Sequence, residues 1–276
     1  MVVLMVVLGA AVLHATWNAM AHGAPDRVAG LALFELAAGA IGLVAVLVMG
    51  LPPADTWGYI IASAVLHLAY LGGLLASYQL GQFSQMYPLA RGTSPWVVAV
   101  VSIVVLHQAL AVVELAGVLL ISAGLIALVF IGRPGRQQVP ALLAAFGTGL
   151  TIAAYTVVDG LAVHKMPVLT YMGWVFMLQG FLMPLVVLAW RGTRVLRQPR
   201  SAVLSGLGGG VVSMVAYGLV LWAQTRGTLA AIAALRETSI IFGAIIGALF
   251  FGEHFGPRRA LAAAVVVGGI VLISLG

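Results

Sequence analysis

The sequence predicts an all-α integral membrane protein in which ten transmembrane helices form two inverted five-helix repeats around a central cavity. Three observations lead to this prediction. Hydrophobic residues make up 63% of the 276 residues and charged residues only 7%. The apolar runs are each about as long as a bilayer is thick. Distinctive polar residues of the first half recur about 145 positions later in the chain, and Gly73 recurs in the same way as Gly218.

The composition excludes most classes of soluble protein. A soluble domain carries about 25% charged residues, so this chain could not cover itself with a polar surface. A soluble enzyme, a nucleic-acid-binding module and a disordered protein are therefore excluded, and the lipid bilayer is the expected surrounding. The net charge of +6 is spread thinly, which fits loop anchoring better than nucleic-acid binding. The absence of cysteine excludes disulfides, thiolate metal sites and cysteine nucleophiles.

The apolar runs predict helices, because the strands of membrane barrels alternate apolar and polar residues whereas Ile41–Met49 is apolar on every side. About 20 apolar residues span a bilayer. Turn residues such as Pro52-Pro53 and Met166-Pro167 separate the runs. The expected spans are residues 2–21, 28–50, 57–79, 84–105, 111–131, 140–162, 168–190, 202–224, 229–251 and 258–275. The first lacks a basic n-region, so we expect it to be retained rather than cleaved as a signal peptide.

The two halves of the chain share a polar pattern. The matching residues are Gln79 with Gln224, Arg91 with Arg236, Thr93 with Thr238 and Ser94 with Ser239. We expect a first repeat over 1–131, a cytoplasmic linker over 132–139 and a second repeat over 140–276. Because each repeat holds an odd number of spans, the second enters the membrane in the opposite sense. This architecture is typical of secondary transporters, whose site lies near the midplane where the repeats meet.

Loop charges predict the orientation. The connections after odd-numbered spans are rich in arginine, namely Arg27, Arg133, Arg136, Arg191, Arg194, Arg197, Arg200, Arg258 and Arg259. The connections after even-numbered spans hold only Lys165 and Arg226. The positive-inside rule then places both termini outside, in a multi-pass protein of the bacterial cytoplasmic (inner) membrane.

Two arginines within spans are candidates for substrate binding. An ionisable residue inside a span costs about 2.5–3.5 kcal/mol and is therefore a functional hypothesis. Arg91 and Arg236 occupy equivalent positions in the two repeats and could bind a carboxylate or a phosphate. The alternative is that each pairs with Glu35 or Glu237 and locks helices together. Pro88 and Pro95 flank Arg91 and are expected to kink or unwind its helix.

Aromatic and polar residues recur at helical spacing on several spans. His67, Tyr70 and Tyr78 share a face of the third span, Tyr155 and Asp159 a face of the sixth, and Ser213 and Tyr217 a face of the eighth. Such faces would form a cavity suited to a small amphipathic solute. The candidate substrate-binding residues are His14, Trp17, Asn18, Tyr78, Tyr87, Arg91, Tyr155, Tyr217, Arg236 and Glu237.

Several chemistries have no motif in the sequence. There is no nucleotide-binding loop of the Walker type, no HExxH site and no Gly-x-Ser-x-Gly elbow, so we expect neither an enzyme, a metal site nor a cofactor. Proton coupling through Glu35, Glu237 or His14 and passive facilitated exchange both remain open. We expect a monomer.

The second half resembles the end of an EamA repeat of the drug/metabolite transporter superfamily. The residues that carry the resemblance are Ala234-Leu235-Arg236-Glu237-Thr238-Ser239, Phe250-Phe251-Gly252-Glu253 and Gly268-Gly269, echoed by Tyr87-Pro88-Leu89-Ala90-Arg91 and Gly124. In the first half, Gln108 stands where the family has the glutamate. The resemblance, to the ten-helix metabolite exporter branch, implies a basket of helices around a central cavity. Members of that branch are commonly drawn with both termini in the cytoplasm, the reverse of what the loop charges predict.

The first interpretation is a secondary transporter that works by alternating access, in particular an exporter of amino acids or similar small metabolites, purines included. Within the superfamily, a drug or cation exporter would need Glu35 as its membrane-embedded carboxylate, and a sugar-phosphate carrier would use the two arginines. A channel or a membrane enzyme is a remote alternative.

Overall fold

The computed structural model describes the chain except residues 23–25, 81–82, 131–138, 194–196, 252–256 and 276. The described residues form α-helices, one short 3₁₀ helix, η1 (Ala54–Thr56), and no strand. The helices are α1 (Val2–His22), α2 (Arg27–Met49), α3 (Trp57–Leu80), α4 (Phe83–Val104), α5 (Val112–Phe130), α6 (Val139–Ala162), α7 (Val168–Arg191), α8 (Arg200–Gln224), α9 (Leu229–Arg236), α10 (Ser239–Phe251) and α11 (Pro257–Leu275). The all-α prediction is confirmed.

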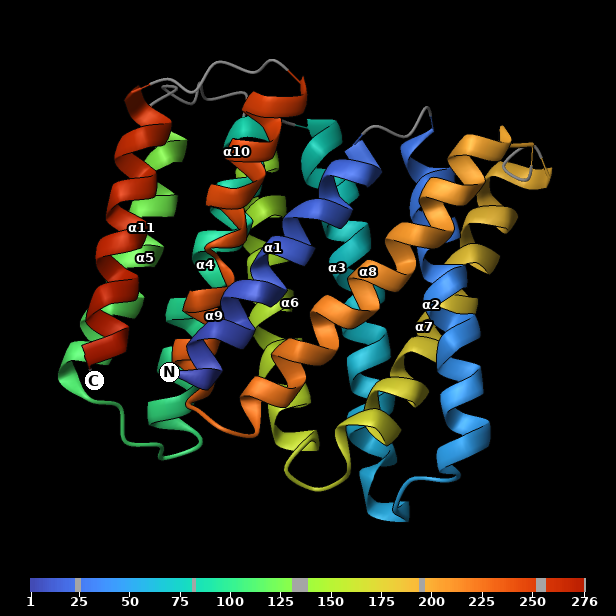
Figure 1. Ribbon diagram of the computed structural model, residues 1–276, viewed down its shortest axis with the longest axis horizontal. Helices are drawn as coiled ribbons and strands as arrows, with labels where there is room; N and C mark the ends of the chain where they lie inside the picture. The colour runs from blue at the N-terminus through green and yellow to red at the C-terminus, as the bar shows by residue number, and fades with distance from the viewer. Residues whose placement is uncertain (23–25, 81–82, 131–138, 194–196, 252–256, 276) are drawn as a thin grey trace.

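The helices stand side by side and run in alternating directions. In Figure 1 the chain rises through α1, descends through α2 and continues in this way, except that α9 and α10 rise one after the other, so that both termini lie toward the same edge. Among the described residues, six helices are long and apolar enough to cross a membrane: α1, α2, α3, α6, α7 and α8. The chain is therefore a multi-pass membrane protein.

Local turn chemistry explains where several helices begin and end. Asp26 precedes α2, and its side chain accepts hydrogen bonds from the backbone N–H groups of Val28 and Ala29 at 3.0 and 3.2 Å, as an N-cap does. Gly50 ends α2 with φ of 81°, and Gly192 ends α7 with φ of 67°. Glycine adopts this left-handed backbone without the steric cost of a Cβ.

The expectation of one continuous helix over 229–251 is wrong. The chain leaves α9 after Arg236 and enters α10 at Ser239. At the break the hydrogen bonds span three residues instead of four: Glu237 N–H donates to the carbonyl of Ala234 and Thr238 N–H to that of Leu235. At this point two buried polar side chains contact α4: Glu237 forms an ion pair with Arg91, and Ser239 accepts a hydrogen bond from it. By contrast, α4 stays a helix throughout, although it contains both Pro88 and Pro95.

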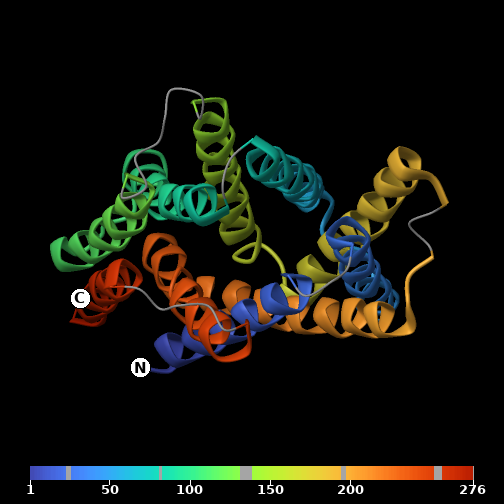
Figure 2. The same ribbon diagram turned by 90° about the horizontal axis from the view of Figure 1, so that it is seen from above.

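The packing joins the first five predicted spans to the last five. α3 packs on α6 and α8 on α1, while α4 packs on α6 and both α9 and α10 on α1. α2 packs against α7 at one end of the molecule and α5 against α11 at the other (Figures 1 and 2). Seen from above, the remaining helices form two facing rows between these end pairs (Figure 2).

Glycines let the helices of both end pairs approach closely. A Cβ added at Gly180 of α7 would lie 2.4 Å from the carbonyl oxygen of Glu35 and 2.5 Å from the Cα of Gly39, both on α2. A Cβ added at Gly117 of α5 would lie 2.6 Å from the carbonyl oxygen of Gly269 on α11. Only a residue without a side chain fits at these crossings.

Candidate functional site

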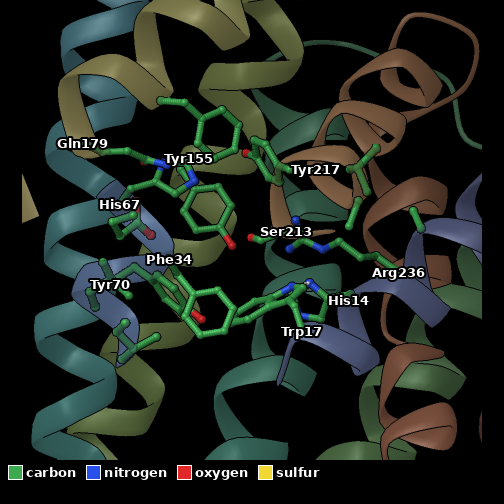
Figure 3. A pocket seen from close by; sticks show the side chains of 17 residues that line it. His14, Trp17, Phe34, His67, Tyr70, Tyr155, Gln179, Ser213, Tyr217 and Arg236 are labelled. Atoms are coloured by element: carbon green, nitrogen blue, oxygen red, sulfur yellow. Dashed lines mark hydrogen bonds between the residues drawn. The ribbon is translucent and has the colours of Figure 1, made fainter. Parts of the chain in front are cut away.

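A small cavity of about 80 Å³ lies in the middle of the molecule, where the two rows of helices face each other. Side chains from α1, α2, α3, α6, α7, α8 and α9 line it (Figure 3). Its polar and aromatic lining consists of His14, Trp17, Phe34, Glu35, His67, Tyr70, Tyr155, Phe176, Gln179, Ser213, Tyr217 and Arg236. The cavity therefore draws on both predicted repeats.

Aromatic rings make up one wall of the cavity. The ring of Tyr155 stacks on His67, with 4.1 Å between the ring centroids. Tyr70 and Tyr217 meet Tyr155 edge-on at 5.9 and 6.4 Å, and Phe176 meets Tyr217 at 5.9 Å. These rings come from α3, α6, α7 and α8. They hold one another in place and present both ring faces and edges to the cavity.

A second group of rings belongs to α1 and α2. Trp17 lies edge-on to His14 at 5.0 Å and to Phe34 at 5.9 Å, and its Nε1–H donates to His14 Nδ1 at 3.2 Å. Asn18, one residue further, donates from Nδ2 to the carbonyl oxygen of His14 at 2.7 Å. Asn18 therefore binds the backbone of its own helix, while His14 and Trp17 reach the cavity.

The two repeat-related arginines have different surroundings. Arg91 is 2% exposed, and its Nε lies 2.7 Å from Oε2 of the fully buried Glu237. Its Nη2 also donates to Ser239 Oγ at 3.3 Å. Arg236 Nε stays 3.9 Å from Glu237 Oε1, and its guanidinium lies 5.8 Å from the Tyr155 ring centroid. Arg91 is thus engaged by Glu237, while Arg236 faces the cavity.

Buried hydrogen-bonding atoms around the cavity lack partners on two sides. In the part of the chain that the structure describes, Nε and Nη2 of Arg236 have no hydrogen-bond acceptor, and Oε2 of Glu35 and Oε1 of Gln179 have no donor. Gln179 and Arg236 lie on opposite sides of the close-up view in Figure 3. Glu35 also lines the cavity, and its backbone carbonyl lies against Gly180, the residue that follows Gln179 on α7. The cavity therefore has a cationic donor side and an acceptor side.

The structure brings five of the ten predicted site residues to the cavity. These are His14, Trp17, Tyr155, Tyr217 and Arg236. Four do not line it: Asn18, Tyr87, Arg91 and Glu237. Tyr87 contacts Arg91, whose guanidinium lies 5.9 Å from the centre of its ring. The side chain of Tyr78 is outside the described residues.

Sequence reasoning missed four cavity-lining residues of α2 and α7: Phe34, Glu35, Phe176 and Gln179. It considers Glu35 only as a partner of an arginine, a titratable group or the carboxylate of a cation exporter. A signal is present in the sequence, because Glu35 is the one acid of α2 and Gln179 the one amide of α7. A lone hydrogen-bonding side chain in an otherwise apolar span needs a protein or ligand partner.

Comparisons with known proteins bear on the fold and on the family. A solved structure described as "Crystal structure of protein" superposes with a TM-score of 0.76 over 99% of this chain and 97% of that chain, at 18% identity. A likeness at that identity shows the fold alone. No curated protein matches.

The second half of the chain, residues 139–275, matches the model of the EamA-like transporter family. These residues comprise α6 to α11, which supply Tyr155, Gln179, Tyr217 and Arg236 to the cavity. The chain belongs to the EamA-like transporter family, a family of membrane transporters within the drug/metabolite transporter superfamily.

Proposed function

We propose that the protein is a secondary transporter that exports amino acids or similar small amphipathic metabolites by alternating access. The observation that carries this proposal is the Arg236 guanidinium, which faces an aromatic-lined cavity with two buried nitrogens that have no hydrogen-bond acceptor among the described residues. A planar guanidinium is suited to bind a carboxylate through two parallel hydrogen bonds. Burial without a hydrogen-bond acceptor is costly for such a group, and Glu237 lies 3.9 Å away, so an anionic substrate that accepts these bonds would stabilise it.

The opposite side of the cavity suits an amine. Glu35 Oε2 and Gln179 Oε1 are buried acceptors without donors among the described residues, and an ammonium group carries three N–H donors and no acceptor. The rings between the two sides would cover the apolar part of the solute. A zwitterion with a carboxylate toward Arg236 and an ammonium toward Glu35 would satisfy all of these groups.

The arrangement of the helices supports a mechanism with two inverted repeats, in which α9 and α10 together form the ninth of ten spans. α1 rises and α6 descends in Figure 1, and the contacts of α3 with α6 reappear as those of α8 with α1. The cavity lies where the two halves meet, as in transporters of this architecture. Its volume of about 80 Å³ is below the roughly 300–1,000 Å³ of ordinary ligand pockets. Admitting a solute therefore requires the surrounding helices to move apart.

A drug or cation exporter is the second candidate. The unpartnered Oε2 of Glu35 favours it, since a membrane-embedded carboxylate can bind a cation without help from Arg236. A sugar-phosphate carrier would depend on Arg236 as an amino-acid exporter does, but it would not need Glu35. The three substrate classes thus differ in which of these two residues they require.

Counterflow into proteoliposomes tests the proposal, with radiolabelled amino acids, purines, guanidinium compounds and sugar phosphates as the panel. We expect saturable exchange of an amino acid that Arg236→Ala lowers at least tenfold and Arg236→Lys lowers less. Arg226→Ala, at an exposed position, is the matched control and should exchange normally. Exchange of cations alone, unaffected by Arg236→Ala, would contradict the proposal. Efflux from preloaded cells that overproduce the protein tests the direction.

A further inference from the structure

Asp159 of α6 is a buried carboxylate that the substrate cavity does not use. It is 0% exposed and is absent from the cavity lining. The ion pairs within the described residues join Arg91 and Arg236 to Glu237 and Arg191 to Asp26, so none of them includes Asp159. A buried carboxylate without a cation needs hydrogen-bond donors. Asp159 has two: Tyr171 O–H donates to Oδ1 and Tyr217 O–H to Oδ2.

The two tyrosines lie on different sides of the carboxylate. Tyr217 lines the substrate cavity. Tyr171 lies in the first turn of α7, where its N–H donates to the carbonyl oxygen of Pro167 at 3.0 Å, next to the connection between α6 and α7 at the lower edge of Figure 1. Asp159 itself is within one turn of the end of α6. Asp159 therefore joins the cavity wall, at Tyr217, to the buried Tyr171 in the part of α7 that lies near this edge.

The charged and titratable groups that surround Asp159 are a histidine, two tyrosines and two arginines, so Asp159 is the carboxylic acid among them. His67 of α3 faces it and contacts Tyr217 edge-on at 5.6 Å, while its Nδ1 lies 2.9 Å from the carbonyl oxygen of Ser63. α7 and α8 contribute the two tyrosines. Arg236 of α9 is held over the Tyr155 ring, itself on α6, and on α4 Arg91 is engaged by Glu237.

We propose that Asp159, between Tyr171 and Tyr217, binds and releases the proton that couples transport to the pH gradient. This inference rests on the proposed transport function and adds its driving ion. One proton adds to a carboxylate oxygen of Asp159, which changes its charge from −1 to 0, and the same proton later leaves to the opposite side. No other bond forms or breaks, and no second reactant is needed.

Protonation would reorganise the cavity wall. Both oxygens of the ionised carboxylate accept a tyrosine hydroxyl, whereas the protonated acid carries an O–H donor of its own. The new buried O–H needs an acceptor, and a tyrosine hydroxyl that turns to accept it no longer donates to that oxygen. Because Tyr217 also lines the cavity, the charge of Asp159 and the shape of the substrate cavity are linked. This linkage is what coupled transport requires.

Two assays on the reconstituted protein separate coupling from exchange. Counterflow at equal pH measures substrate exchange, and a pH gradient with an internal pH dye measures driven accumulation and proton flux. For Asp159→Asn we expect counterflow to remain measurable while accumulation and substrate-induced proton flux fall at least tenfold. Asp55→Asn, an exposed acid in η1, is the control and should keep all three activities.

A second variant keeps the proposal testable if Asp159→Asn does not fold. Tyr171→Phe leaves both the carboxylate and the cavity lining in place but removes one donor from the ionised form. We expect its accumulation to persist with a pH profile displaced upward by at least half a unit. Accumulation by Asp159→Asn at the wild-type level, exchange without proton flux in the wild type, or an unchanged Tyr171→Phe profile would each overturn the inference. Failure of the wild type to exchange any substrate would instead overturn the proposed transport function.

Discussion

Arg91 and Arg236 occupy the same place in the repeated Arg-x-Thr-Ser pattern, yet one is paired and the other faces the cavity. The difference arises because a single carboxylate, that of Glu237, lies near both arginines but closer to Arg91. Glu237 lies 2.7 Å from Arg91 Nε and 3.9 Å from Arg236 Nε, and the first repeat has Gly92 where the second has Glu237. The asymmetry of one residue is thus enough to give two equivalent arginines different roles.

Glu237→Gln should destabilise the protein strongly. It would leave two buried guanidinium groups without a countercharge, and breaking a buried ion pair in this way costs about 3–5 kcal/mol. Thermal unfolding in detergent measures the loss. Arg91→Met in the same background should recover part of it, because one of the uncompensated charges is removed. A Glu237→Gln protein that melts at the wild-type temperature would show that the pair does not stabilise the fold.

Glu35→Gln should discriminate between substrates with and without an amine. If Glu35 binds the ammonium group, the variant should bind an amino acid about tenfold more weakly, equivalent to about 1.4 kcal/mol. The corresponding 2-oxo acid, which keeps the carboxylate but lacks the amine, should bind as before. Competition with counterflow measures both affinities. An equal loss for the two compounds would contradict an ammonium site at Glu35.

At the scale of the helices, the ends follow from local chemistry, whereas the break between α9 and α10 does not. The predicted span 28–50 agrees with Arg27–Met49 and 168–190 with Val168–Arg191, because Asp26, Gly50 and Gly192 act through their own turns. At the break, Glu237 forms an ion pair with Arg91, which is far away in the sequence, so no neighbouring residue indicates this contact. Conversely, α4 stays helical through both of its prolines, although proline chemistry alone predicts either a kink or unwinding there.

The same contrast governs which cavity residues can be found from the sequence. The rings of α3, α6 and α8 recur at helical spacing, so the sequence alone groups them on faces. Glu35 and Gln179 are single polar residues on α2 and α7. They come together because glycines let these two helices cross closely, and no local pattern reports which helices cross.

Gly180→Ala tests this crossing. Its Cβ would lie 2.4 Å from the carbonyl oxygen of Glu35, so α2 and α7 must separate, and overpacking of this kind costs about 1–3 kcal/mol. Gly72→Ala on α3 is the control, because nothing lies within 4 Å of its added Cβ and alanine favours a helix by up to about 1 kcal/mol. Melting temperatures in detergent compare the two. Equal melting temperatures would contradict tight packing at Gly180.

The orientation of the whole molecule can be read by cysteine labelling, since the chain has no cysteine of its own. Gly227→Cys, after α8, and Ser201→Cys, at the start of α8, are both exposed. From the loop charges we expect an impermeant maleimide to label Gly227→Cys on intact cells and Ser201→Cys only after permeabilisation. The reverse pattern would place both termini in the cytoplasm, as in the commonly drawn members of the ten-helix branch.

The packing of the first five spans on the last five has a consequence for how the protein is made. α1, α2 and α3 leave the ribosome before α8, α7 and α6, the helices against which they pack. During synthesis these early spans are therefore surrounded by lipid, without their packing partners, until the later spans are inserted. Completion of the second half, rather than of either half alone, is the step that assembles the cavity.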